Sequence, residues 1–168
     1  MLMSLVATAL VLAPIGMGPL AEPERERLRV LVVEALNSGD ATQEQYENVV
    51  LRLNSDPCKL ASNNLTDDEK DRLEGALSLS MSISSVEVYS WMSLESWYVV
   101  HSNISPGDAT FGFFSSNPMG GAKPIAFWAG AAAFYEVGEI SEWVTEHVPG
   151  APRELAECFA WSMTMGAE

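Results

Sequence analysis

Positive charge is scarce in this sequence. Its 168 residues include nine Lys and Arg against 23 Asp and Glu, which gives a formal net charge of −14. After Arg72 the sequence contains only two cationic residues, Lys123 and Arg153. A surface this acidic repels phosphate groups. We therefore expect no unaided binding to nucleic acid and no adhesion to anionic lipid.

The sequence also lacks the residue patterns of common catalytic, metal and cofactor sites. It has two histidines, His101 and His147, and the patterns GxSxG, GxxxxGK[ST], GxGxxG and HExxH are absent. No spacing of Cys and His fits a zinc site. We predict no catalytic residue set, no metal and no cofactor. Binding without catalysis is therefore favoured over an enzyme, which stays open as an alternative.

An unbroken apolar run is missing as well. A membrane-spanning helix needs about 20 apolar residues, and Pro14 interrupts the uncharged N-terminal segment, residues 1–21. An apolar stretch at residues 5–12 with a Pro/Gly break after it resembles a secretory signal. Against this, no Lys or Arg precedes the stretch, and Pro19 lies where a small residue is preferred. We expect a signal peptide or an apolar N-terminal helix at residues 1–21, and a single globular domain at residues 22–168.

Two cysteines, Cys58 and Cys158, are too few for a metal site and too far apart for a CxxC motif. In an exported chain we expect them to form a disulfide, which would close a loop of about 100 residues. In a reducing cytosol they would be two small core residues. We favour a secreted or cell-envelope protein that contacts membrane only through its N-terminal segment. A cytoplasmic protein with a buried N-terminal helix is the alternative.

The N-terminal half contains three segments with helical signals. Apolar residues spaced three and four apart predict a helix over residues 24–36. Thr-x-x-Gln and Thr-x-x-Glu capping boxes at Thr42 and Thr66 predict the starts of two more helices. We expect the second helix to end before Pro57 and the third to end at Gly75 in the left-handed conformation.

The middle of the chain has the patterns of strands. Apolar and serine residues alternate without error over residues 77–84, which is the period of a half-buried strand. Residues 97–100 and 110–114 are rich in β-branched and aromatic side chains. We predict three or four antiparallel strands between about Leu77 and Phe114. The alternative is one continuous helix over residues 66–100, which would make the protein an all-α bundle.

Helical signals return in the C-terminal part. Pro124 suits the first turn of a helix that would extend to His147, and Pro152 opens a last helix. The predicted fold is therefore α+β, with helices at both ends packed on a small antiparallel sheet in the middle. The helix at residues 124–147 would carry four glutamates on one side, and solvated helix faces have this pattern far more often than cation sites. These glutamates are Glu136, Glu139, Glu142 and Glu146.

One loop has the features of a ligand site. In Gly120-Gly121-Ala122-Lys123, two glycines let backbone N–H groups converge beside a rare cation and ahead of a predicted helix. A small anion or carboxylate could bind there. We name Gly120, Gly121 and Lys123, together with His101, as candidate ligand-binding residues. The simpler interpretation is a flexible connector that carries an ordinary lysine.

Five tryptophans and eight methionines offer an adaptable apolar surface. We expect an exported or cell-envelope, non-enzymatic binding protein that engages a protein partner through an exposed aromatic patch. One alternative is a small pocket protein or enzyme with an anionic ligand in a cleft near Lys123 and His101. A second is a subunit of a larger membrane or filament assembly, attached through its N-terminal helix.

Overall fold

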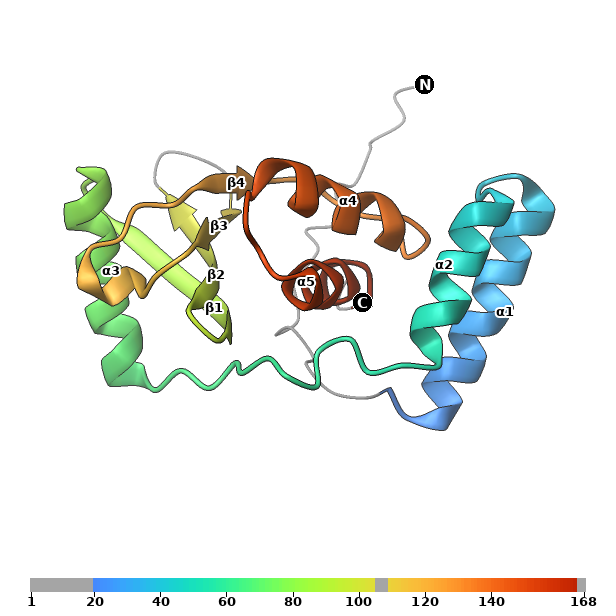
Figure 1. Cartoon of the computed structure of the whole chain (residues 1–168). Helices are drawn as coiled ribbons and strands as arrows, with labels where there is room; N and C mark the ends of the chain where they lie inside the picture. The colour runs from blue at the N-terminus through green and yellow to red at the C-terminus, as the bar shows by residue number, and fades with distance from the viewer. Residues whose placement is uncertain (1–19, 105–108, 166–168) are drawn as a thin grey trace, which may run out of the picture.

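The computed structural model describes residues 20–104 and 109–165. Within these ranges the chain has five α-helices and a four-stranded antiparallel sheet in the middle, so the predicted α+β arrangement is confirmed (Figure 1). The elements, in chain order, are α1 (Glu22–Ser38), α2 (Gln43–Leu53), α3 (Asp67–Met81), β1 (Val86–Leu94), β2 (Trp97–Ile104), β3 (Ala109–Phe114), the short 3₁₀ helix η1 (Pro118–Gly120), β4 (Ala126–Trp128), α4 (Val137–His147) and α5 (Arg153–Met165).

The sheet has the strand order β1-β2-β3-β4, and helices cover both of its faces (Figure 1). On one face, Leu73 and Leu77 of α3 form a buried cluster with Val88 and Val100. On the other face, a larger cluster joins Phe113 to buried residues of α2, α4 and α5. The sheet therefore separates two apolar cores, and α3 supplies the buried helical residues of the smaller one.

A β-bulge lets β1 contribute to both cores. The pairing of β1 with β2 shifts register between Val88 and Ser90. Val86 and Val88 belong to the core under α3, whereas Met92 and Leu94 belong to the larger core. All four residues are even-numbered and would point to the same side of a regular strand. Because the bulge inserts one extra residue, the side chains after it point to the opposite face of the sheet from the one that their position in a regular strand would give.

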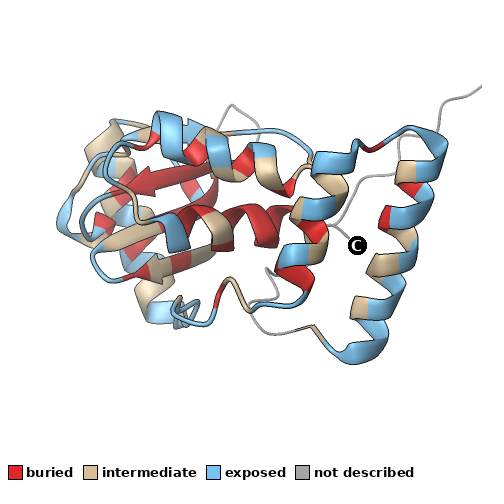
Figure 2. Ribbon diagram, turned by 45° about the vertical axis from the view of Figure 1, so that its right-hand side comes forward, coloured by how far each residue is buried: buried red, intermediate tan, exposed pale blue. Residues whose placement is uncertain are grey.

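The helix α5 lies at the centre of the larger core. Residues 155–164 are all buried except Glu157, which is the pattern of a helix enclosed on every side (Figure 2). Phe159 makes edge-on ring contacts with Phe111 and Phe113 of β3. Through these contacts α5 is fixed against the sheet.

A covalent bond joins α5 to the segment after α2. The sulfur atoms of Cys58 and Cys158 are 2.11 Å apart, and both residues are buried in the larger core. The structure thus pairs the two cysteines as the disulfide expected for an exported chain. The bond ties the helical N-terminal half to the central helix.

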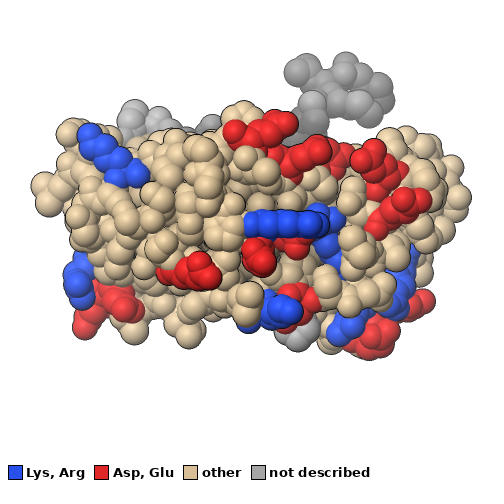
Figure 3. Space-filling view, in the orientation of Figure 1, with Lys and Arg blue, Asp and Glu red and all other residues tan. Residues whose placement is uncertain are grey.

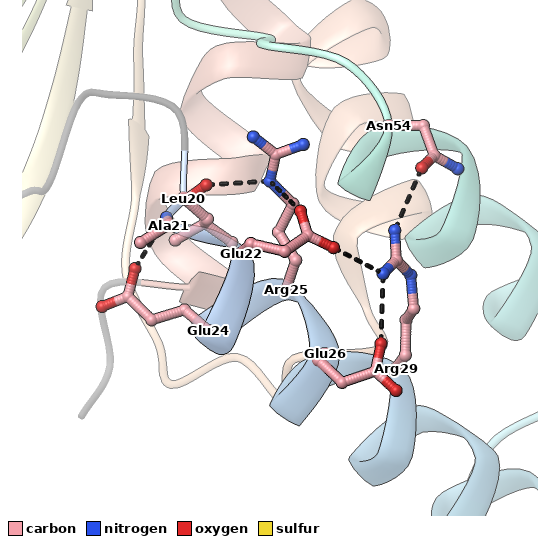
Figure 4. Close-up of polar contacts among 8 residues, drawn as sticks. All are labelled: Leu20, Ala21, Glu22, Glu24, Arg25, Glu26, Arg29 and Asn54. Carbon is pink, nitrogen blue, oxygen red and sulfur yellow. Dashed lines mark hydrogen bonds and ion pairs between the residues drawn. The ribbon is translucent and has the colours of Figure 1, made fainter.

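The helices α1 and α2 form a hairpin at one side of the molecule (Figure 1). Gly39 adopts the left-handed conformation (φ 82°) and ends α1. Arg29 of α1 contacts Glu22 and Glu26 of its own helix and Asn54 at the end of α2 (Figure 4). These contacts are exposed to solvent, so each adds little to stability. The capping boxes predicted for α2 and α3 are both present.

The strand predicted for residues 77–84 is wrong, because residues 77–81 belong to α3 and β1 begins only at Val86. The helix α3 continues through Gly75 and ends at Ser82, which takes the left-handed conformation (φ 58°) in place of the predicted glycine stop. The alternation of apolar and serine residues does not mark one buried face here, because Leu77 is buried against the sheet while Leu79 is 83% exposed. The alternative of a continuous helix is also wrong, because β1 and β2 occupy the stretch that it would need.

The helix predicted for residues 124–147 is wrong in its first half. Residues 126–128 form β4, where Trp128 pairs with Phe111 of β3. Gly130 has a φ of 146°, which is outside the helical region. The helix α4 begins only at Val137. Pairing with the sheet therefore outweighs the helical spacing of the apolar residues.

The prediction for residues 1–21 falls almost wholly outside the described residues, which begin at Leu20. Among the helices that the structure describes, none combines the length and the apolar character needed to cross a lipid bilayer.

Candidate functional site

His101 is a buried residue of β2. Its imidazole is stacked on the ring of Phe111, with ring centroids 4.2 Å apart, and the ring of Tyr89 lies 5.1 Å away. Burial lowers the pKa of His101 below its ordinary value. The imidazole is therefore neutral near pH 7 and is part of the apolar core.

The loop with the other predicted ligand residues follows β3. Gly120 ends η1, and Gly121 has a left-handed conformation (φ 84°) with its N–H bonded to the carbonyl of Pro118. Lys123 is exposed. Neither of the two cavities described below is lined by Gly120, Gly121, Lys123 or His101. The structure does not gather them around a shared cavity, and the anion site near them stays a prediction.

A polar cleft lies between α2, α4 and the start of α5. It has a volume of about 560 Å³, within the range of small-molecule sites. Its lining includes Gln45, Asn48 and Arg52 of α2, Glu139 and Glu142 of α4, and Arg153 and Glu157 of α5. Figure 3 shows acidic side chains gathered over α4 and α2.

A close approach of α2 and α4 shapes this cleft. Gly138 lies so near Asn48 that a Cβ at position 138 would be 2.7 Å from the Asn48 Nδ2 atom. At the rim, Gln45 Nε2 donates a hydrogen bond to a carboxylate oxygen of Glu139. The missing side chain of Gly138 thus allows the two helices to meet, and the Gln45–Glu139 bond joins them.

Arg52 is the unusual residue of the cleft. It is 9% exposed, and its Nη1 donates to the backbone carbonyl of Asn48 (3.2 Å) and to the Asn48 Oδ1 (3.1 Å). Its Nε is buried and has no hydrogen-bond partner in the described part of the chain. Burial lowers the pKa of Arg52, and the charge of Glu157 opposes that effect. A guanidinium nevertheless stays protonated in proteins.

No carboxylate among the described residues forms an ion pair with Arg52. Across the cleft, Glu157 is bonded instead by Arg153, whose Nε lies 2.8 Å from the Glu157 Oε1. Buried cations are normally paired because the loss of hydration is costly. Arg52 is therefore a buried positive charge at the wall of an open cleft. It has two hydrogen bonds to Asn48 and no carboxylate partner within the described ranges.

The glutamates of the predicted acidic face have separate roles. Glu136 precedes α4 and accepts a hydrogen bond from the backbone N–H of Ala133 (2.6 Å). Glu139 and Glu142 line the cleft, while Glu146 does not. Across residues 20–104 and 109–165, no group of three or more His, Cys, Asp or Glu residues is placed to hold a metal ion.

Sequence reasoning missed Arg52, although one signal was present. The predicted second helix has Val49 and Leu53 on its apolar face, and Arg52 adjoins them at i+3 and i−1. A lone cation beside a buried helix face needs a partner or an aqueous opening. The cleft provides that opening.

A second cavity, of about 350 Å³, lies between α1, the segment before α4 and the end of α5. Its walls include Leu28, Leu31, Phe134 and Met165. This cavity borders Leu20, where the described chain begins.

The tryptophans do not form an exposed surface. Trp161 is buried, and the other four are partly buried. The most exposed aromatic side chains in the described ranges are Tyr89 on β1 and Phe127 on β4, at 47% and 45%.

Comparison with protein-family models, with curated proteins and with solved structures finds no match for this chain.

Proposed function

We propose that the protein is an exported, non-enzymatic binding protein whose ligand occupies the cleft between α2, α4 and α5. The observation that carries the proposal is the unpaired guanidinium of Arg52 at the wall of this cleft. A buried charge of this kind is costly to folding, and recognition of a ligand is a reason to retain it. Ionisable groups whose pKa is shifted by burial in a cleft are enriched at functional sites, and burial lowers the pKa of Arg52.

Export is supported by the Cys58–Cys158 bond, because disulfides persist in oxidising compartments and are rare in the cytosol. The intact mass of protein recovered from its native host, measured with and without reduction, tests this part of the proposal. We expect a mass two hydrogens lower before reduction and the loss of the N-terminal segment. Free thiols together with an intact Met1 would contradict export.

Binding in the cleft is tested by nuclear magnetic resonance with the oxidised, isotope-labelled chain. A set of small polar molecules of differing charge is titrated, and amide shifts are assigned along the sequence. We expect saturable shifts around Asn48 in α2 and Glu142 in α4. Saturable shifts only elsewhere, or none with any compound, would overturn the assignment of the cleft as the ligand site.

A second candidate is a protein partner bound through an apolar surface. One observation favours it: the short edge strand β4 exposes Phe127, and the neighbouring Ile125 is 41% exposed. A sheet edge with apolar side chains can pair with an added strand. Substitution Phe127→Ser would then abolish capture of that partner and leave ligand shifts in the cleft unchanged.

A further inference from the structure

The charges that line the cleft do not match a simple anion. Arg52 and Arg153 are its two cations, against four glutamates, Glu44, Glu139, Glu142 and Glu157. Arg153 and Glu157 neutralise each other through their 2.8 Å contact. A free anion would meet one available cation among several carboxylates. A free cation would leave the guanidinium of Arg52 unpaired.

A second group in the cleft is open to a ligand. Glu139 already accepts a hydrogen bond from Gln45. Glu142 is exposed, and its carboxylate has no hydrogen bond or ion pair with any residue that the structure describes. It comes from α4, whereas Arg52 comes from α2. Glu44 is likewise exposed and without such a partner among the described residues, but it lies on α2, the same helix as Arg52, so Glu142 is the available carboxylate on the wall that faces the guanidinium.

We propose that the cleft binds a small zwitterion, with the ligand carboxylate at Arg52 and its protonated amine at Glu142. This inference rests on the proposed function and adds the chemical class of the ligand. A guanidinium presents several N–H donors in a planar fork that suits a carboxylate. Free amino acids and short peptides have this pair of charges, and a cleft of about 560 Å³ admits either.

The buried position of Arg52 also has an explanation that involves no ligand. Arg52 would then serve only to fasten α2 through its two bonds to Asn48. That role predicts that removal of the guanidinium lowers stability and changes no binding constant. The two explanations differ in their effect on ligands, so the experiment measures both quantities.

The test uses the oxidised full-length chain and five probes, each titrated by magnetic resonance at constant ionic strength. Glycine and triglycine are the zwitterions, and they distinguish a free amino acid from a short peptide. Acetate carries the carboxylate alone, and ethylamine carries the amine alone. Methylated glucose, which has no charge, reports nonspecific shifts. We expect at least one zwitterion to bind about tenfold more tightly than either half-probe, because each paired charge adds a charge-assisted hydrogen bond.

Three variants assign the charges. Arg52→Gln is expected to weaken binding of the better zwitterion about tenfold or more, and Glu142→Gln to weaken it several-fold. Glu146→Gln removes a carboxylate from the same helix outside the cleft, so it is the matched control and should change nothing. Because Arg52→Gln alters a buried residue, its melting temperature is measured in parallel. Glu142 is exposed, so its variant tests the proposal even if the Arg52 variant does not fold.

Four results would overturn the inference. If acetate binds as tightly as the zwitterions, the cleft selects an anion and Glu142 has no part. If Glu142→Gln and Glu146→Gln behave alike with every probe, the amine has no partner at Glu142. If all charged probes fail while other compounds in the wider screen still shift α2 and α4, the zwitterion assignment fails and the proposed function stands. If nothing binds the cleft, both fail.

Discussion

His101 and Phe111 occupy directly opposed positions of β2 and β3, and their rings are stacked with planes only 9° apart. Phe111 in turn contacts Phe159 at the centre of the core. His101 is 5% exposed, and its buried Nε2 has no hydrogen-bond partner among the described residues. The site therefore suits a neutral imidazole and penalises an imidazolium.

Stability is expected to fall with acidification because of His101. Burial lowers its pKa in the folded chain, whereas the unfolded chain titrates near the ordinary value of about 6.5. The unfolded state thus binds more protons just below that value. The free energy of unfolding should be highest above about pH 6.5 and should decrease below it, by up to about 1.4 kcal/mol per pH unit for one proton. Urea denaturation at several pH values between 5 and 7.5 measures this slope.

The variant His101→Phe retains an aromatic ring and removes the titration, so its pH slope between 7 and 5 should be shallower than that of the parent. Parallel slopes in the parent and in His101→Phe would show that other groups cause the acid sensitivity.

Removal of the disulfide is expected to be costly. The bond joins residues 100 positions apart, and the chain-entropy model gives about 4–5 kcal/mol for a loop of that length. The double variant Cys58→Ala with Cys158→Ala should lose stability of this order in guanidinium denaturation. Reduction of the parent should lower its denaturation midpoint in the same direction, and reduction of the variant should have no effect. Equal midpoints for oxidised and reduced parent would contradict the expectation.

Because Gly138 lies close to Asn48, the effect of Gly138→Ala on stability should depend on which residue occupies position 48. Alanine is favoured over glycine in helices by up to about 1 kcal/mol. In the parent, Gly138→Ala should be neutral or destabilising, because the new Cβ would displace Asn48 from its bond with Arg52. In an Asn48→Ala background the obstacle is absent, and the same change should stabilise by about 0.5–1 kcal/mol. A double-mutant cycle measured by urea denaturation checks this; additive effects would refute it.

Ser82 offers a position where glycine should stabilise. It ends α3 with a φ of 58°, a conformation that costs residues with a Cβ about 1–2 kcal/mol. Ser82→Gly should raise the melting temperature by a few degrees, because the relief exceeds the added entropy of the unfolded chain. Ser82→Ala keeps the Cβ and is the matched control, for which no rise is expected. A rise of equal size in both variants would point to the lost hydroxyl instead of the backbone.

The parts of the fold that could be predicted from sequence depend on local interactions. The starts of α2 and α3 follow from Thr42 and Thr66, whose hydroxyls accept hydrogen bonds from N–H groups three residues later. The end of α1 follows from Gly39. Such signals need no knowledge of the rest of the chain.

The parts that could not be predicted depend on distant partners. β4 exists because residues 126–128 pair with β3 and because Trp128 packs on Phe159 of α5. α3 continues past Gly75 because Leu77 reaches the sheet. The candidate cleft is of the same kind, because Arg52 acquires its importance from α4 and α5, which come some 85 or more residues later. The local pattern of polar and apolar residues does not indicate which distant segments will pair.

The Cys58–Cys158 bond turns α3, the sheet, α4 and the first part of α5 into a closed covalent ring, with the α1–α2 hairpin outside it. A protease that cuts once at the exposed stretch Ser115–Asn117 opens the ring, and both pieces stay attached until a reductant is added. A cut at the exposed turn between α1 and α2 instead frees α1 from all covalent attachment. A single nick therefore has different consequences in the two places: α1 is lost, whereas α2, which supplies Arg52, stays joined to the ring through Cys58.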